Sequence, residues 1–344
     1  MKTCPQCLAT HADETTVCPT DGTALVADPI WPEGTVVDRT YRIVAKIGDD
    51  VFCTVYKAVH QKSGERYTLN VMSWGLACDP GFVELFRQDA ALRKRLHHAN
   101  VAHVEAIGEA DDGRPFIVME YMSGQSLKKY IEQDAPFAPR RACAIARQVA
   151  AGLEAAHRLG MIHRDVKPES IYLMDGSDVA KIKLLGLGNA RLKEALLGDR
   201  FRTSPEAVIG TMQYLSPEQA LGQLGNALDG RADLYSLGVV MYQMLTGELP
   251  FHATTPADWM LAHIQEIPTP IRVDYARLEI PNPLTDFVQR CMSKNRTQRP
   301  AGAREFIREL DSVEQEIGHI EKAKNAAPRT PRRHKASGWK FWKS

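Results

Sequence analysis

The chain has 344 residues, of which 44% are hydrophobic and 25% are charged, and its formal net charge at pH 7 is +1. This composition is typical of a soluble globular protein, and the length suits one two-lobed domain with small additions. The near-neutral charge favours no class of partner, and no run approaches the roughly 18 apolar residues of a membrane span. The start, Met1-Lys2-Thr3-Cys4, leads into polar sequence and is unlike a secretory signal, so we expect a cytoplasmic protein.

Residues 1–26 predict a small zinc site. A C-x-x-C pair opens the segment, and a third cysteine is followed three residues later by an aspartate where a fourth cysteine would stand. In a reducing compartment this clustering favours metal over disulfides, and zinc accepts carboxylate or imidazole as well as thiolate. The candidate ligands are Cys4, Cys7, Cys18 and Asp21, with His11 as an alternative. The segment resembles the short zinc ribbons of some bacterial proteins, and a degraded ribbon without metal is the other interpretation.

The same segment is acidic, with Asp13 and Glu14 and almost no basic residue. An acidic surface disfavours phosphate binding, so we expect no nucleic-acid partner and instead a role in protein contact or packing. Residues 27–38 contain three proline or glycine residues and are expected to form a linker.

After the linker, β-branched segments predict strands and apolar spacing predicts helices. The expected strands are 41–47, 54–59, 65–71, 100–104 and 116–121, and the expected helices are 83–97 and 140–159.

The most specific stretch is His163–Ser170, which reads H-R-D-V-K-P-E-S. It resembles the catalytic loop of protein kinases, whose pattern is H-R-D-x-K-x-x-N. Gly210–Glu218, Asp233–Val239 and Gln298–Pro300 match further motifs of that family at its spacing. Residues 39–318 are therefore similar to the bacterial, eukaryote-like (Hanks-type) Ser/Thr protein kinases. The resemblance implies a two-lobed α+β fold, with a small β-rich lobe and a larger helical lobe, and an ion pair between Arg299 and Glu218.

The resemblance also assigns site positions. It makes Asp165 the base that accepts the substrate hydroxyl proton, and it places Lys167 near the transferred phosphate. The nucleotide-pocket positions that it implies are Gly48, Val55, Asn70, Met119, Glu120, Met122 and Tyr172.

Several matching positions depart from the family's pattern. Asn70 replaces the lysine that pairs with the ATP phosphates, Ser170 replaces a metal-binding asparagine, and Gly186 replaces the metal-binding aspartate of D-F-G. The glycine-rich loop keeps Gly48 but carries Asp50 where its second glycine would be. These losses leave no competent magnesium site.

Three interpretations remain open. The first is a pseudokinase, a signalling or scaffold protein whose partner is another protein, such as an active kinase or its substrate. The second is an atypical, low-activity, ATP-dependent kinase that uses Asp165 as base. The third is an interaction protein that works through its zinc ribbon or its tail, with the kinase fold inert; whether ATP binds at all is open.

Residues 319–344 are expected to form a disordered tail that is rich in Lys and Arg. Trp339, Phe341 and Trp342 interleave with its basic residues. This pattern suits an anionic lipid surface, so peripheral attachment at the inner face of the membrane is an alternative to a solvated tail.

Overall fold

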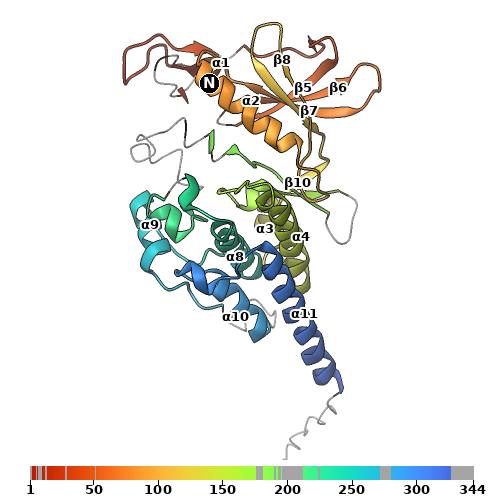
Figure 1. Ribbon diagram of the computed structural model, residues 1–344, viewed down its shortest axis with the longest axis vertical. Coiled ribbons are helices and arrows are strands. Elements are labelled where there is room, and N and C mark those ends of the chain that lie inside the picture. The colour runs from red at the N-terminus through yellow and green to blue at the C-terminus, as the bar shows by residue number, and fades with distance from the viewer. Residues whose placement is uncertain are drawn as a thin grey trace, which may run out of the picture.

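The computed structural model of the chain describes residues 2–4, 6, 10–11, 14–27, 29–50, 52–175, 181–189, 191–192, 195, 212–223, 225–271 and 280–326. These residues form a small lobe built on a β-sheet and a larger lobe built on helices (Figure 1). The arrangement confirms the predicted two-lobed α+β fold.

The small lobe is an antiparallel sheet of six strands in the order β4-β5-β6-β7-β9-β8. Their bounds are β4 (Val36–Val37), β5 (Tyr41–Asp49), β6 (Cys53–His60), β7 (Arg66–Met72), β8 (Val104–Glu109) and β9 (Pro115–Glu120). On one face the sheet buries a cluster around Ile43, Tyr56 and Phe116. On the other it packs against two helices, α1 (Trp74–Ala77) and α2 (Pro80–Lys94), through a second cluster that includes Phe82 and Phe86.

Three boundaries differ from the prediction. Residues 27–38 are not all linker, because Val36–Val37 pairs with β5 and the side chain of Val37 is buried. The fourth long strand begins at Val104 instead of ending there, and Val101 forms a bridge to Leu184 of the large lobe. Helix α2 starts earlier than expected, because the carboxylate of Asp79 caps its first turn and Pro80 suits the first helical position.

The large lobe surrounds α8, whose side chains are buried on nearly every side. Its helices are α3 (Leu127–Asp134), α4 (Pro139–His157), α7 (Pro217–Ala220), α8 (Arg231–Thr246), α9 (Pro256–Gln265), α10 (Asn282–Cys291) and α11 (Ala303–Ala326). Short 3-10 turns are η1 (Pro168–Ser170), η3 (Gly225–Ala227) and η5 (Arg296–Gln298). A small sheet, β10 (Gly124–Ser126), β11 (Ile171–Met174) and β12 (Ile182–Leu184), lies where the two lobes meet.

Both ends of the chain carry additions to these lobes. At the start, β1 (Lys2–Thr3), β2 (Thr10–His11) and β3 (Val26–Ala27) form a separate small sheet, and β3 packs against α1. At the other end, α11 continues to Ala326, so the first eight residues of the expected disordered tail are helical. Residues 327–344, with the basic and aromatic side chains of that tail, lie outside the described residues. Among the helices described, none combines the length and hydrophobicity needed to cross a bilayer.

Candidate functional site

A cavity of about 780 Å³ opens between the sheet of the small lobe and the catalytic-loop region of the large lobe. It gathers most of the site residues predicted from the sequence. Those that line it are Val55, Asn70, Met119, Met122, Asp165, Lys167, Ser170, Tyr172 and Gly186. Gly48 and Glu120 are not among its lining residues. The carboxylate of Glu120 instead accepts hydrogen bonds from the His103 backbone N–H (2.8 Å) and the Lys183 ammonium (2.7 Å).

Asp233, on the buried helix α8, holds the catalytic loop in place. Its carboxylate accepts the backbone N–H groups of His163 (2.9 Å) and Arg164 (2.7 Å) and lies 2.7 Å from His157 Nε2. Burial alone would raise the pKa of Asp233, but the hydrogen bond and charge of His157, with the contribution of His163, lower it below its usual value. These contacts stabilise Arg164 at a left-handed φ of 62°, a strained conformation for a side chain of this size.

The loop presents Asp165 to the cavity beside Lys167. The ammonium of Lys167 lies 2.9 Å from Asp165 Oδ2, and the backbone N–H of Asp165 donates to His163 Nδ1 at 3.3 Å. The Nε2 atom of His163 lies 2.7 Å from the Leu185 carbonyl oxygen. Burial lowers the pKa of His163, so its ring is neutral and acts as a fixed support. The base and cation positions of the family's loop are therefore both in place.

The three departures from the family's pattern meet at the same cavity. The register between β7 and β9 sets Asn70 diagonal to Met119, and its amide Nδ2 donates to the Met119 sulfur at 3.2 Å. The Ser170 hydroxyl donates to the Lys167 carbonyl at 2.8 Å and accepts the Lys167 N–H at 3.1 Å, which ties it into η1. Gly186 adds no side chain at a φ of 81°. None of these three residues carries the positive charge of the family's lysine or the aspartate and asparagine oxygens that hold magnesium in the family.

The turn between β5 and β6 carries a negatively charged side chain, that of Asp50. One carboxylate oxygen of Asp50 accepts the backbone N–H groups of Phe52 at 2.7 Å and Cys53 at 2.8 Å, and Asp50 lines the cavity. In the kinases that this chain resembles, the backbone of this turn covers the ATP phosphates. Here a side-chain carboxylate satisfies two of those donors and adds a negative charge.

Arg93 also lines the cavity, although it is not among the site residues predicted from the sequence. Asp89 pairs within its own helix, α2, with Arg93, whose Nε lies 2.9 Å from Asp89 Oδ2. Both side chains are buried, and Arg93 lines the cavity. Burial raises the pKa of Asp89, while the charges of Arg93 and Arg191 oppose that rise. The i, i+4 spacing of an acidic and a basic residue was the signal that could have found the pair.

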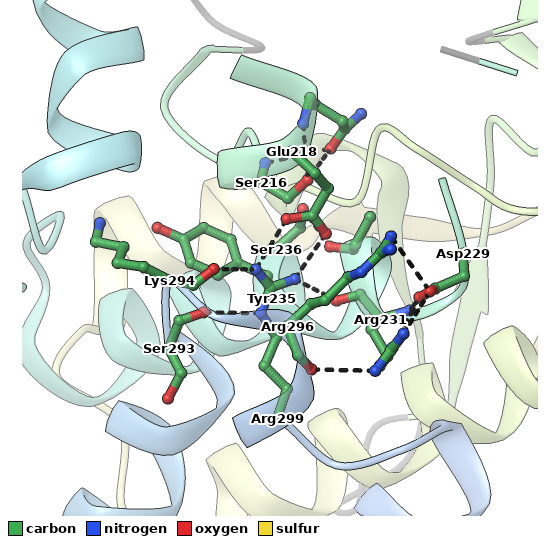
Figure 2. Close-up of polar contacts among 12 residues, drawn as sticks. Ser216, Glu218, Asp229, Arg231, Tyr235, Ser236, Ser293, Lys294, Arg296 and Arg299 are labelled. Carbon is green, nitrogen blue, oxygen red and sulfur yellow. Dashed lines mark hydrogen bonds and ion pairs between the residues drawn. The ribbon is translucent and has the colours of Figure 1, made fainter. Parts of the chain in front are cut away.

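The predicted ion pair between Glu218 and Arg299 is present and buried. Two nitrogens of Arg299 donate to the two carboxylate oxygens of Glu218 at 2.7 and 2.8 Å. Figure 2 shows that the same guanidinium also donates hydrogen bonds to the backbone carbonyls of Ser293 and Arg231. The guanidinium lies over the ring of Tyr235. The pair joins α7 to the segment before α11. The matching motif starts at 210, and its first two residues lie outside the described residues.

The N-terminal segment brings together three of its predicted metal ligands. The thiols of Cys4 and Cys18 and the carboxylate of Asp21 lie within 4.8 Å of one another. His11 is not part of this group, and Cys7 lies outside the described residues.

Comparisons with known proteins agree with this geometry. Residues 41–310 match the family described as "Protein kinase domain". The chain is 34% identical to the serine/threonine-protein kinase pkn3 of Myxococcus xanthus, over 84% of this chain and 53% of that protein. It is 38% identical to a probable serine/threonine-protein kinase PknB of Corynebacterium glutamicum, over 68% of this chain and 35% of that protein. The chain thus spans about half, or less, of the length of these relatives. The kinase domain of Mycobacterium tuberculosis PknI has a similar fold, with a TM-score of 0.58 and 24% identity over 83% of this chain and all of that domain.

Proposed function

The chain belongs to the protein kinase family, and we propose that within it this protein is a pseudokinase: a signalling or scaffold protein that transfers phosphate very weakly or not at all. One observation carries the proposal. Asn70, Ser170 and Gly186 line the cavity at the positions where the family has a phosphate-binding lysine and two magnesium ligands. Magnesium and fixed cations neutralise the charge that develops on the transferred phosphoryl group, so their joint loss removes most of the catalytic stabilisation.

The cavity also disfavours the triphosphate itself. Asp50 lines the cavity in the turn whose backbone covers the ATP phosphates in the family, and a carboxylate about 5 Å from a phosphate oxygen costs roughly 3 kcal/mol per unit charge at an effective dielectric near 20. Lys167 does not by itself neutralise the charge of Asp50, because its ammonium is paired with Asp165.

Several other family residues that the chain retains keep the large lobe folded. Asp233 holds the catalytic loop, and the Glu218–Arg299 pair joins two distant segments, whether or not phosphate is transferred. A kinase fold kept in shape without its phosphate and metal groups suits a protein that presents a surface. We propose that its partner is another protein, such as an active kinase or a substrate of one.

A weak kinase is the second candidate, and it rests on the loop itself. Asp165 faces the cavity with Lys167 at 2.9 Å, which is the arrangement that a general base and a phosphate contact would use. Such an enzyme would need a metal ligand from elsewhere in the cavity.

Thermal unfolding with ATP separates the two candidates. The purified chain is titrated with millimolar ATP, with and without magnesium, while its Tm is followed; a ligand that binds the folded state raises Tm by linkage. The pseudokinase proposal expects no magnesium-dependent rise. A magnesium-dependent rise, together with phosphate transfer that Asp165→Asn abolishes, would instead establish the weak kinase.

A further inference from the structure

We propose that Cys4, Cys18 and Asp21 are ligands of a structural zinc ion that holds the N-terminal segment together. The three residues come from two parts of the segment: Cys4 follows β1, and Cys18 and Asp21 lie close together before β3. Cys4 is 0% exposed and Cys18 is 1% exposed, whereas Asp21 closes the group from the solvent side.

The spacing of the three ligand atoms fits one ion. Four ligands about 2.3 Å from a tetrahedral zinc are about 3.8 Å from one another. The Cys4 sulfur lies 3.3 and 3.5 Å from the two carboxylate oxygens of Asp21, and all three groups lie within 4.8 Å of one another. A zinc ion needs only small side-chain shifts to sit among them.

The chemistry of this donor set also favours zinc over harder cations. Two thiolates and a carboxylate suit zinc, whereas magnesium and calcium take oxygen ligands alone. The Cys4 thiol donates to Asp21, so zinc binding replaces that hydrogen bond and releases the thiol protons of both cysteines to solvent. Structural zinc sites have four ligands, and the described residues supply three of them.

The fold of the segment needs such a centre. Its strands have two residues each, which is too short for an isolated sheet to be stable in water. Hydrogen bonds from Lys2 to the Thr15 carbonyl and from Thr23 to Gln6 and Asp21 are largely exposed. A structural zinc ion supplies on the order of 10 kcal/mol of folding free energy, which would order the segment against α1.

The test is the zinc content of the purified 344-residue chain under reducing conditions, measured by mass spectrometry of the metal. We expect about one zinc per chain in the wild type and almost none in a Cys4→Ser/Cys18→Ser double variant. Cys78→Ser, at an exposed cysteine after α1, and Asp111→Asn, at an exposed aspartate in a loop, are the matched controls and should keep the metal.

A gain-of-function variant keeps the test decisive if the serine variants fold poorly. Asp21→Cys would complete a second C-x-x-C pair, and we expect it to retain zinc at chelator concentrations that strip the wild type. A wild type without zinc would overturn the proposal, as would zinc retained by the double variant. A disulfide between Cys4 and Cys18, detected by mass spectrometry after alkylation without reductant, would overturn it as well.

Discussion

The pseudokinase proposal can be tested residue by residue, because the three substituted positions line one cavity and can be changed back to the family's side chains. Asn70→Lys, Ser170→Asn and Gly186→Asp together would restore the family's phosphate and metal groups. An added Cβ at Gly186 would have its nearest neighbours at 3.8 Å, so an aspartate fits, and its left-handed backbone costs about 1 kcal/mol. We expect magnesium-ATP to raise the Tm of the triple variant. A ligand at one hundred times its Kd stabilises the folded state by about 2.7 kcal/mol. Gly186→Asp alone is the control. A triple variant whose Tm does not change with magnesium-ATP would contradict the assignment of these three positions to the phosphate and metal groups.

Asp50 provides a second test at this scale. In the triple variant, Asp50→Gly removes a charge and releases the Phe52 and Cys53 N–H groups, so we expect ATP to bind at least about tenfold more tightly, or about 1.4 kcal/mol. Asp50→Asn keeps an acceptor and removes only the charge, so it should give part of the gain. Calorimetric titration measures both. The matched control is Asp49→Asn, since Asp49 pairs with Lys46 and does not line the cavity. An Asp50→Gly variant that binds ATP no better would refute this role.

Which residues come together was largely predictable, because a motif read at family spacing assigns each one to a known position. Val55, Met119 and Tyr172 accordingly line the cavity. What a substituted residue contacts instead was not predictable. The sequence indicates that Asn70 cannot replace a lysine, but only the register of β7 and β9 brings its amide to the sulfur of Met119.

At the scale of elements, prediction worked for segments with a strong pattern and failed at their ends. Helix α4 carries small and apolar residues at helical spacing, and its bounds, Pro139–His157, lie within about two residues of the predicted 140–159. The start of α2 depended on Asp79, a cap that lies outside the apolar repeat used to find the helix. The pair of β4 with β5 depended on two valines inside a proline-rich stretch, where composition favoured a linker. Local composition does not report a partner strand, because pairing is decided by residues distant in the sequence.

The ion pair that joins α7 to the segment before α11 gives the prediction at this scale. Glu218→Gln leaves the buried guanidinium of Arg299 without its anion, so we expect the free energy of unfolding to fall by about 3–5 kcal/mol. The control is Arg304→Gln, which breaks an exposed pair with Glu154 and should cost about 1 kcal/mol or less. Urea denaturation measures both. Equal losses in the two variants would show that burial does not set the strength of the pair.

For the whole molecule, buried histidines link stability to pH. Burial, reinforced by the charge of Lys294, lowers the pKa of His263 to about 3, and its ring lies between Tyr235, Phe251 and Trp259. An unfolded chain binds that proton near pH 6.5, so between about pH 6.5 and 3 the unfolded state holds more protons and stability falls as pH falls. By pH 5, this one residue lowers the free energy of unfolding by about 2 kcal/mol.

The pH dependence of Tm separates this account from a general effect of acid. The pKa of His163 is also lowered by burial, so the wild-type Tm should fall from pH 7 to pH 5, and His263→Gln should remove part of that slope and not all of it. His252→Gln, at an exposed side chain, should leave the slope unchanged. Because a glutamine side chain does not take up a proton on unfolding, the deficit in Tm of the His263→Gln variant at pH 7 should shrink at pH 5. If Tm falls with pH in parallel for the variant and the wild type, His263 takes up its proton equally well in the folded and unfolded states. That result would contradict the effect of burial on the pKa of His263.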